Sequence, residues 1–176
     1  LGMGVGATTW LTATLAAGTL AGFCIASAVL SRACDPARMA LIGAAIGVPA
    51  FGTVIATTVM PSVTLFAIGV FFIGLGAGLF GHGTLTLTMN RAPKEQVGLA
   101  LGAWGAVQAT AAGAGVALGG LGRDAVQSLA SRGVFGEALA TPATGYAFVY
   151  GIEIVLLLAT IVAMTALLRS DARRPA

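Results

Sequence analysis

Long runs of apolar residues without a charged side chain divide this sequence into segments of membrane-spanning length. A transmembrane helix needs about 20 predominantly apolar residues. The longest run, Met39 to Asn90, is long enough for two helices, and Met60-Pro61-Ser62 forms a natural break between them. The pattern predicts an all-α membrane protein with one transmembrane domain, whose five helices span about residues 7–30, 39–59, 62–88, 97–121 and 145–168.

Composition agrees with this fold class and excludes others. Hydrophobic residues make up 57% of the chain, charged residues 9%, and the mean hydropathy is +0.96. Soluble domains carry about 25% charged residues, and disordered chains are polar. The net charge is only +3 and the basic residues are scattered, so we expect lipid and no nucleic acid as a partner. Motifs of soluble-enzyme chemistry are absent from the sequence, and we expect no enzymatic activity.

The distribution of Lys and Arg predicts an orientation in the membrane. Seven of these residues lie in the loops after the first and third predicted helices and in the C-terminal tail, against two in the loop after the fourth. We therefore expect an inner-membrane protein with a cytoplasmic C-terminus. The odd number of helices and the absence of an initiator Met indicate the C-terminal half of a larger chain.

Two ionisable residues inside predicted spans are candidates for function. Glu153 is the only acidic one, and a carboxylate at that depth costs about 2.5–3.5 kcal/mol on insertion scales. It could carry protons, contact a polar ligand, or stay protonated against a neighbouring helix. The neutral imidazole of His82 could be the axial ligand to the magnesium of a chlorophyll-type ring. Gly78, one turn earlier, would leave room for the flat macrocycle. Alternatively, His82 bonds a helix carbonyl or Thr86.

The fourth predicted helix differs from the others in its many Gly and Ala residues. We expect it to lie inside the bundle or along a cavity. Gln108 is an interior polar contact or a link between helices, and Trp104 could line a ligand surface. We expect the following segment, 122–144, to be the longest loop, with a short amphipathic stretch near its start.

Several motifs from residue 81 onward are distinctive. The most specific is the run Ala103-Trp104-Gly105-Ala106-Val107-Gln108. The others are Gly81-His82-Gly83-Thr84-Leu85-Thr86, Arg91-Ala92-Pro93, Arg123-Asp124, and Gly145-Tyr146-Ala147-Phe148-Val149-Tyr150 with Glu153. With these motifs the chain resembles the PucC/LhaA family, the bacteriochlorophyll delivery branch of the major facilitator superfamily.

The resemblance implies a fold, a function and a site. The five spans would be helices 8–12 of a major facilitator superfamily fold. The protein would help to assemble light-harvesting antennas of a purple phototroph, holding or delivering bacteriochlorophyll and contacting antenna α and β polypeptides or a reaction centre–antenna complex. His82 would bind the pigment magnesium, and the other candidate pigment contacts would be Gly78, Trp104, Gln108 and Glu153.

Two other functions stay open at this point. One is a proton-coupled secondary transporter with Glu153 as the proton carrier. The other is a structural subunit that is retained in a pigment–protein complex.

Overall fold

The computed structural model describes residues 5–32 and 34–171, which form five long α-helices. They are α1 (Val5–Leu30), α2 (Pro36–Ala56), α3 (Val63–Arg91), α4 (Val97–Ser131) and α5 (Thr144–Asp171), with short 3₁₀ turns at Lys94–Gln96 and Glu137–Leu139. Each of the five is long and apolar enough to cross a membrane. Within the described residues there is no strand, so the all-helical prediction is confirmed.

Local chemistry explains where α2 and α3 begin. The Asp35 carboxylate accepts a hydrogen bond from the Ala37 amide at 2.9 Å, and Pro36 occupies the first position of α2, where no amide donor is needed. Ser62 accepts a hydrogen bond from the Leu65 amide at 3.2 Å and caps α3 in the same way. The break expected at Met60-Pro61-Ser62 therefore lies between these two helices.

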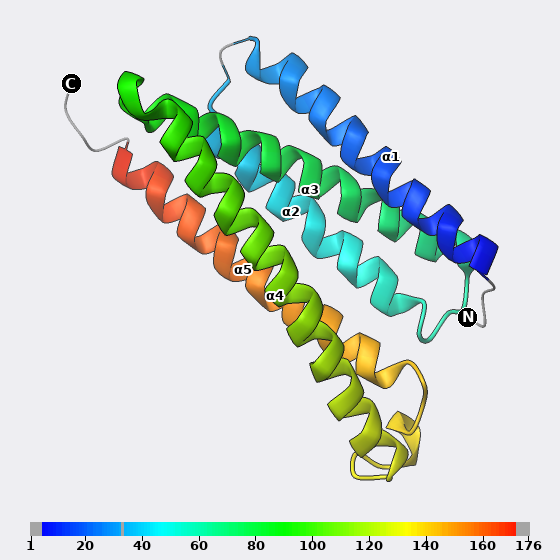
Figure 1. Cartoon of the computed structure of the whole chain (residues 1–176). Helices are drawn as coiled ribbons and strands as arrows, with labels where there is room; N and C mark the ends of the chain where they lie inside the picture. The colour runs from blue at the N-terminus through cyan, green and yellow to red at the C-terminus, as the bar shows by residue number, and fades with distance from the viewer. Residues whose placement is uncertain (1–4, 33, 172–176) are drawn as a thin grey trace.

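The helix α3 holds the bundle together. It packs along α1 on one side and α2 on another, and α2 also packs against α5 (Figure 1). The helix α4 contacts mainly α5 and has a smaller contact with α3. Figure 1 shows the joined ends of α4 and α5 projecting beyond the ends of the other three helices.

The helix α4 is longer than the sequence predicted. The expected loop over 122–144 begins with further helix, because α4 continues to Ser131. It ends in a Schellman motif: Gly133 takes a φ of 75°, its amide bonds the Ala130 carbonyl, and the Val134 amide bonds the Leu129 carbonyl. The apolar pattern ends where charges begin, but the helical hydrogen bonds continue until the glycine ends them.

The helix α4 was predicted to lie inside the bundle, and this prediction is wrong for residues 5–32 and 34–171, which the structure describes. Ala130 is the only buried residue of α4, and residues 106–118 are exposed all around the helix. No other described helix covers this stretch. Its small side chains were expected to face a close neighbour, and in this structure they face none.

Glycines allow α3 to approach its two neighbours closely. A methyl group added at Gly22 or Gly78 would collide with the backbone of the facing helix, α3 or α1 respectively. On the other side, a methyl group at Gly43 of α2 would lie 2.6 Å from the Gly76 carbonyl oxygen, and one at Gly83 would lie 2.8 Å from the Ala40 amide nitrogen. In lipid, helices associate through such close packing because there is no hydrophobic force between them.

This packing predicts that Gly78→Ala destabilises the bundle whereas Gly52→Ala does not. The new methyl at Gly78 meets backbone atoms of α1, and overpacking of this kind costs about 1–3 kcal/mol. Gly52 lies on α2 with nothing within 4 Å, and alanine there improves helix propensity by roughly 0.5–1 kcal/mol. Thermal unfolding of the purified full-length protein in detergent measures the difference. Equal melting temperatures for the two variants would contradict the close α1–α3 contact.

Candidate functional site

The five candidate residues from the sequence do not form one site. Gly78 and His82 lie on α3, Trp104 and Gln108 on α4, and Glu153 on α5. The structure brings together Gly78 and His82 on the α3 face toward α1, and it places the other three elsewhere.

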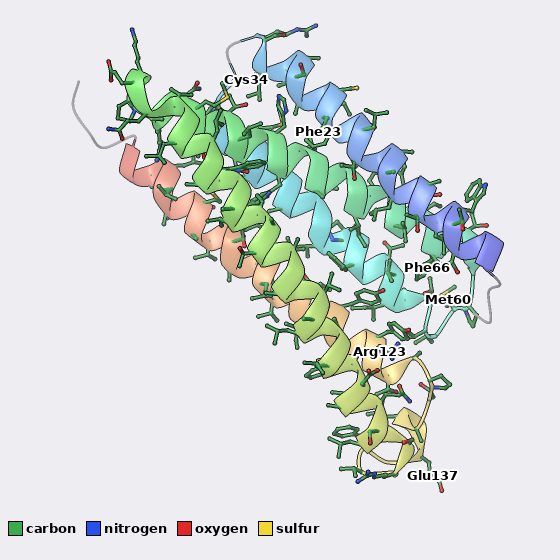
Figure 2. The ribbon with its side chains drawn as sticks, viewed as in Figure 1. Phe23, Cys34, Met60, Phe66, Arg123 and Glu137 are labelled. Atoms are coloured by element: carbon green, nitrogen blue, oxygen red, sulfur yellow. The ribbon has the colours of Figure 1, made fainter. Side chains whose placement is uncertain are left out.

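His82 is half-buried at the edge of the contact between α1 and α3. Its imidazole meets the ring of Phe23 edge to face, with ring centroids 5.9 Å apart and an interplanar angle of 70°. Figure 2 labels Phe23 on α1. The Thr86 hydroxyl donates a hydrogen bond to the His82 backbone carbonyl at 2.9 Å and so does not use the ring. Among residues 5–32 and 34–171, neither imidazole nitrogen has a hydrogen-bond partner, so one remains able to bind a ligand.

The role predicted for Gly78 is wrong. Gly78 is buried, and a methyl group there would meet backbone atoms of Thr19, Gly22 and Phe23. The backbone of α1 therefore fills the space that was expected to hold a flat macrocycle. More room remains at Gly81, where the nearest atom to an added methyl is a Phe23 ring carbon at 3.9 Å.

Trp104 links α4 to α3 on a different face from His82. Its indole nitrogen donates to the Thr84 hydroxyl at 3.3 Å, and that hydroxyl in turn donates to the Phe80 carbonyl at 2.9 Å. Thr84 lies two residues after His82, which turns its side chain by about 200° around the helix. Trp104 consequently does not line a ligand surface shared with His82. Gln108, one turn further along α4, is exposed.

Glu153 is half-buried on α5. It makes no hydrogen bond or ion pair with any residue that the structure describes, and it has no contact with His82 there. An unpaired carboxyl inside an apolar helix therefore remains as a separate feature, which the packing of this chain does not explain.

Sequence reasoning missed a polar cluster where α4 and α5 join. The Arg123 guanidinium donates to the Tyr146 hydroxyl at 2.6 Å, lies 5.0 Å from the centroid of the Tyr146 ring, and pairs with Asp124. Gln127 donates to the Thr141 carbonyl at 3.0 Å and accepts from the Gly145 amide at 3.2 Å.

This cluster joins the two ends of the segment that was expected to be a loop. Figure 2 shows Arg123 near the projecting end of the α4–α5 pair and Glu137 at its tip. One connection joins the fourth and fifth helices, so the sequence could have indicated that residues on its two sides lie close together. It could not indicate that Arg123 pairs with Tyr146, because the extra turns of α4 are not visible in the apolar pattern.

Comparison with known proteins gives consistent matches. Residues 1–172 match the profile of the PUCC protein family. Protein PucC of Cereibacter sphaeroides is 50% identical over 170 residues, which is 97% of this chain and 36% of that protein. Protein PucC of Rhodovulum sulfidophilum is 61% identical over 127 residues, covering 72% of this chain and 28% of the relative.

A further relative is an uncharacterized protein in the puhA-bchM intergenic region of Rhodobacter capsulatus, 43% identical over 175 residues. The match covers 99% of this chain but only 36% of the relative. It therefore spans about a third of the length of the curated relatives, as a C-terminal part of them. No solved structure matches the chain, so the likeness to helices 8–12 of the major facilitator superfamily stays a prediction.

The polar cluster predicts that Arg123→Met loosens the junction of α4 and α5. The variant loses the bond to Tyr146 and the cation–π contact, so amide hydrogen exchange over residues 141–146 should become several-fold faster. Arg132→Met is the matched control, because it removes the same charge from an exposed residue just after α4. Unchanged exchange in Arg123→Met, or an equal increase in both variants, would contradict the structural role of the cluster.

Proposed function

The chain belongs to the PUCC protein family, and from this premise we propose that it is part of a light-harvesting antenna assembly factor. We infer from this membership that the protein is involved in the expression of light-harvesting complexes. The more specific role that we propose is to hold or deliver bacteriochlorophyll within the membrane and to contact the antenna α and β polypeptides. The five apolar helices support a multi-pass membrane location. The inner membrane and a cytoplasmic C-terminus are part of the proposal and follow from the Lys and Arg distribution.

The single observation that carries the pigment role is the imidazole of His82, whose nitrogens have no hydrogen-bond partner within the described residues. Neutral imidazole is a common metal ligand, and His82 would hold the magnesium of a chlorophyll-type pigment through one ring nitrogen. The ring of His82 is half-buried beside the ring of Phe23, and its nitrogens have no hydrogen-bond partner within the described residues. A histidine with a structural role would be expected to use at least one nitrogen in a hydrogen bond, because unsatisfied polar groups are costly in lipid.

We place the proposed pigment at the edge of the contact between α1 and α3 rather than between the two helices, because the α1 backbone covers Gly78. Phe23 would lie beside the bound macrocycle, and the room at Gly81 is on the same helix as the ligand. Gly78 is excluded from this site because α1 covers it. When bound, bacteriochlorophyll would supply only its light-absorbing ring, and His82 would hold that ring in place for transfer to an antenna polypeptide.

This proposal predicts that His82→Leu lowers bound bacteriochlorophyll at least several-fold without unfolding the protein. Leucine keeps the apolar contact with Phe23 but offers no nitrogen to magnesium. Pigment per polypeptide is measured from the near-infrared absorption of the full-length protein, purified from a phototrophic host after removal of antenna polypeptides. Antenna levels in the same cells should also fall.

Met89→Leu is the control for this experiment. It places the same new side chain on an exposed position of α3, two turns beyond His82, and should retain pigment. The melting temperatures of both variants show whether the fold is kept. Unchanged pigment stoichiometry in a folded His82→Leu protein would rule out His82 as the ligand.

Glu153 favours a second candidate function, proton-coupled transport. Its unpaired carboxyl on α5 has the character expected of a proton carrier in a membrane. If transport is the function, Glu153→Gln should abolish pH-dependent uptake in membrane vesicles and leave pigment binding intact. Under the assembly-factor proposal the same variant keeps normal antenna levels, so growth under phototrophic conditions separates the two functions.

Stoichiometric retention of the protein in the mature antenna complex would instead favour a structural subunit.

A further inference from the structure

A groove of about 450 Å³ lies between the end of α3 and the start of α4. Figure 1 shows these helix ends at the opposite end of α4 from its junction with α5. All three residues of the Arg91-Ala92-Pro93 motif line the groove, and the proposed function gives this motif no role. The other lining residues used below are Leu87, Thr88, Gln96, Leu99 and Ala103.

Polar and apolar side chains occupy different depths of the groove. Arg91 is the last residue of α3, and Leu87 lies about one helical turn before it. On the other wall, Gln96 directly precedes α4, whereas Leu99 and Ala103 lie in the first two turns of that helix. Both helices lead from this end into the membrane, so the polar groups lie at its surface and the apolar groups lie deeper. The groove therefore matches a molecule with a polar head and an apolar body.

The polar end of the groove offers hydrogen-bond donors and positive charge. Arg91 is exposed, and its guanidinium has five N–H donors, so it can bind an anion in addition to a protein group. The side-chain amide of Gln96 is exposed and makes no hydrogen bond with any residue in the described ranges. Lys94 is exposed in the same connection, where Glu95 is the one acidic residue. The head that fits this end is an anion.

We propose that the groove binds an anionic phospholipid, whose phosphate contacts Arg91 and Gln96 and whose acyl chain lies along Leu99 and Ala103. The Lys and Arg distribution puts this end on the cytoplasmic side, where basic pockets between transmembrane helices bind anionic lipid heads. Leu99 is 73% exposed and presents an apolar surface to the chain. A soluble phosphate would gain nothing from that surface, which favours the lipid. The site rests on the proposed orientation and is independent of pigment ligation by His82.

Thermal unfolding of the full-length protein in detergent, with added lipid, tests this site. A ligand that binds only the folded state raises the melting temperature. We expect phosphatidylglycerol to raise it, whereas phosphatidylcholine with the same acyl chains, which lacks the net negative charge, should not. Glycerol phosphate, which carries the head without acyl chains, should also have no effect.

Two variants test the two ends of the groove separately. Arg91→Gln removes the cation, and Ala103→Phe fills the apolar end without changing the charge, so each should weaken phosphatidylglycerol affinity at least several-fold. Arg32→Gln is the matched control, because it removes the same charge from an exposed residue that follows α1, on the same predicted side of the membrane. It should bind phosphatidylglycerol like the unmodified protein.

Four results would each overturn the proposal. They are equal stabilisation by phosphatidylcholine, equal stabilisation by glycerol phosphate, an equal loss of affinity in Arg91→Gln and Arg32→Gln, and unchanged affinity in Ala103→Phe. Melting temperatures without lipid show which variants are folded. If Arg91→Gln is not, Ala103→Phe and the comparison of the two lipids decide the question.

Discussion

Close backbone contact between α3 and its two neighbours fixes the arrangement of the first three helices. Apolar side chains do not drive helices together in lipid, and tight packing of small residues must do so. The glycines that make this possible are Gly18 and Gly22 of α1, Gly43 of α2, and Gly69, Gly74, Gly76, Gly78 and Gly83 of α3. Once α1 and α2 are in place, the direction of every other side chain on α3 follows. His82 then meets Phe23, and Thr84 meets Trp104.

The second pair of helices is held differently. The contact of α4 with α5 depends on a polar cluster near one end, where Arg123 and Gln127 bond residues at the start of α5. Trp104 adds one hydrogen bond to α3 near the other end. Between these two attachments, residues 106–118 are exposed. The chain thus contains one tightly packed group of three helices and a hairpin that is incompletely covered, which is the arrangement expected of part of a larger bundle.

The fold could be predicted from the sequence because transmembrane helices depend on local hydropathy, and four of the five segments end where their apolar runs end. The end of α4 could not, since its last turns are amphipathic and stop only at Gly133, whose φ is 75°. The candidate residues were partly recognisable by chemistry, but their grouping was not. The spacing of Gly78 and His82 shows that they share a face, yet only the packing shows that α1 covers Gly78. The pairing of Arg123 with Tyr146 likewise becomes visible only when the packing of α4 against α5 is known.

The near-infrared absorption of the unmodified full-length protein decides whether this protein holds bacteriochlorophyll. The protein is purified from a phototrophic host in mild detergent, stripped of antenna polypeptides, and examined for pigment and magnesium together. We expect a bacteriochlorophyll band that stays with the protein, with magnesium in equal amount to the pigment. A colourless protein that retains its fold would contradict a pigment-holding role and leave docking of antenna polypeptides or transport as the function to pursue.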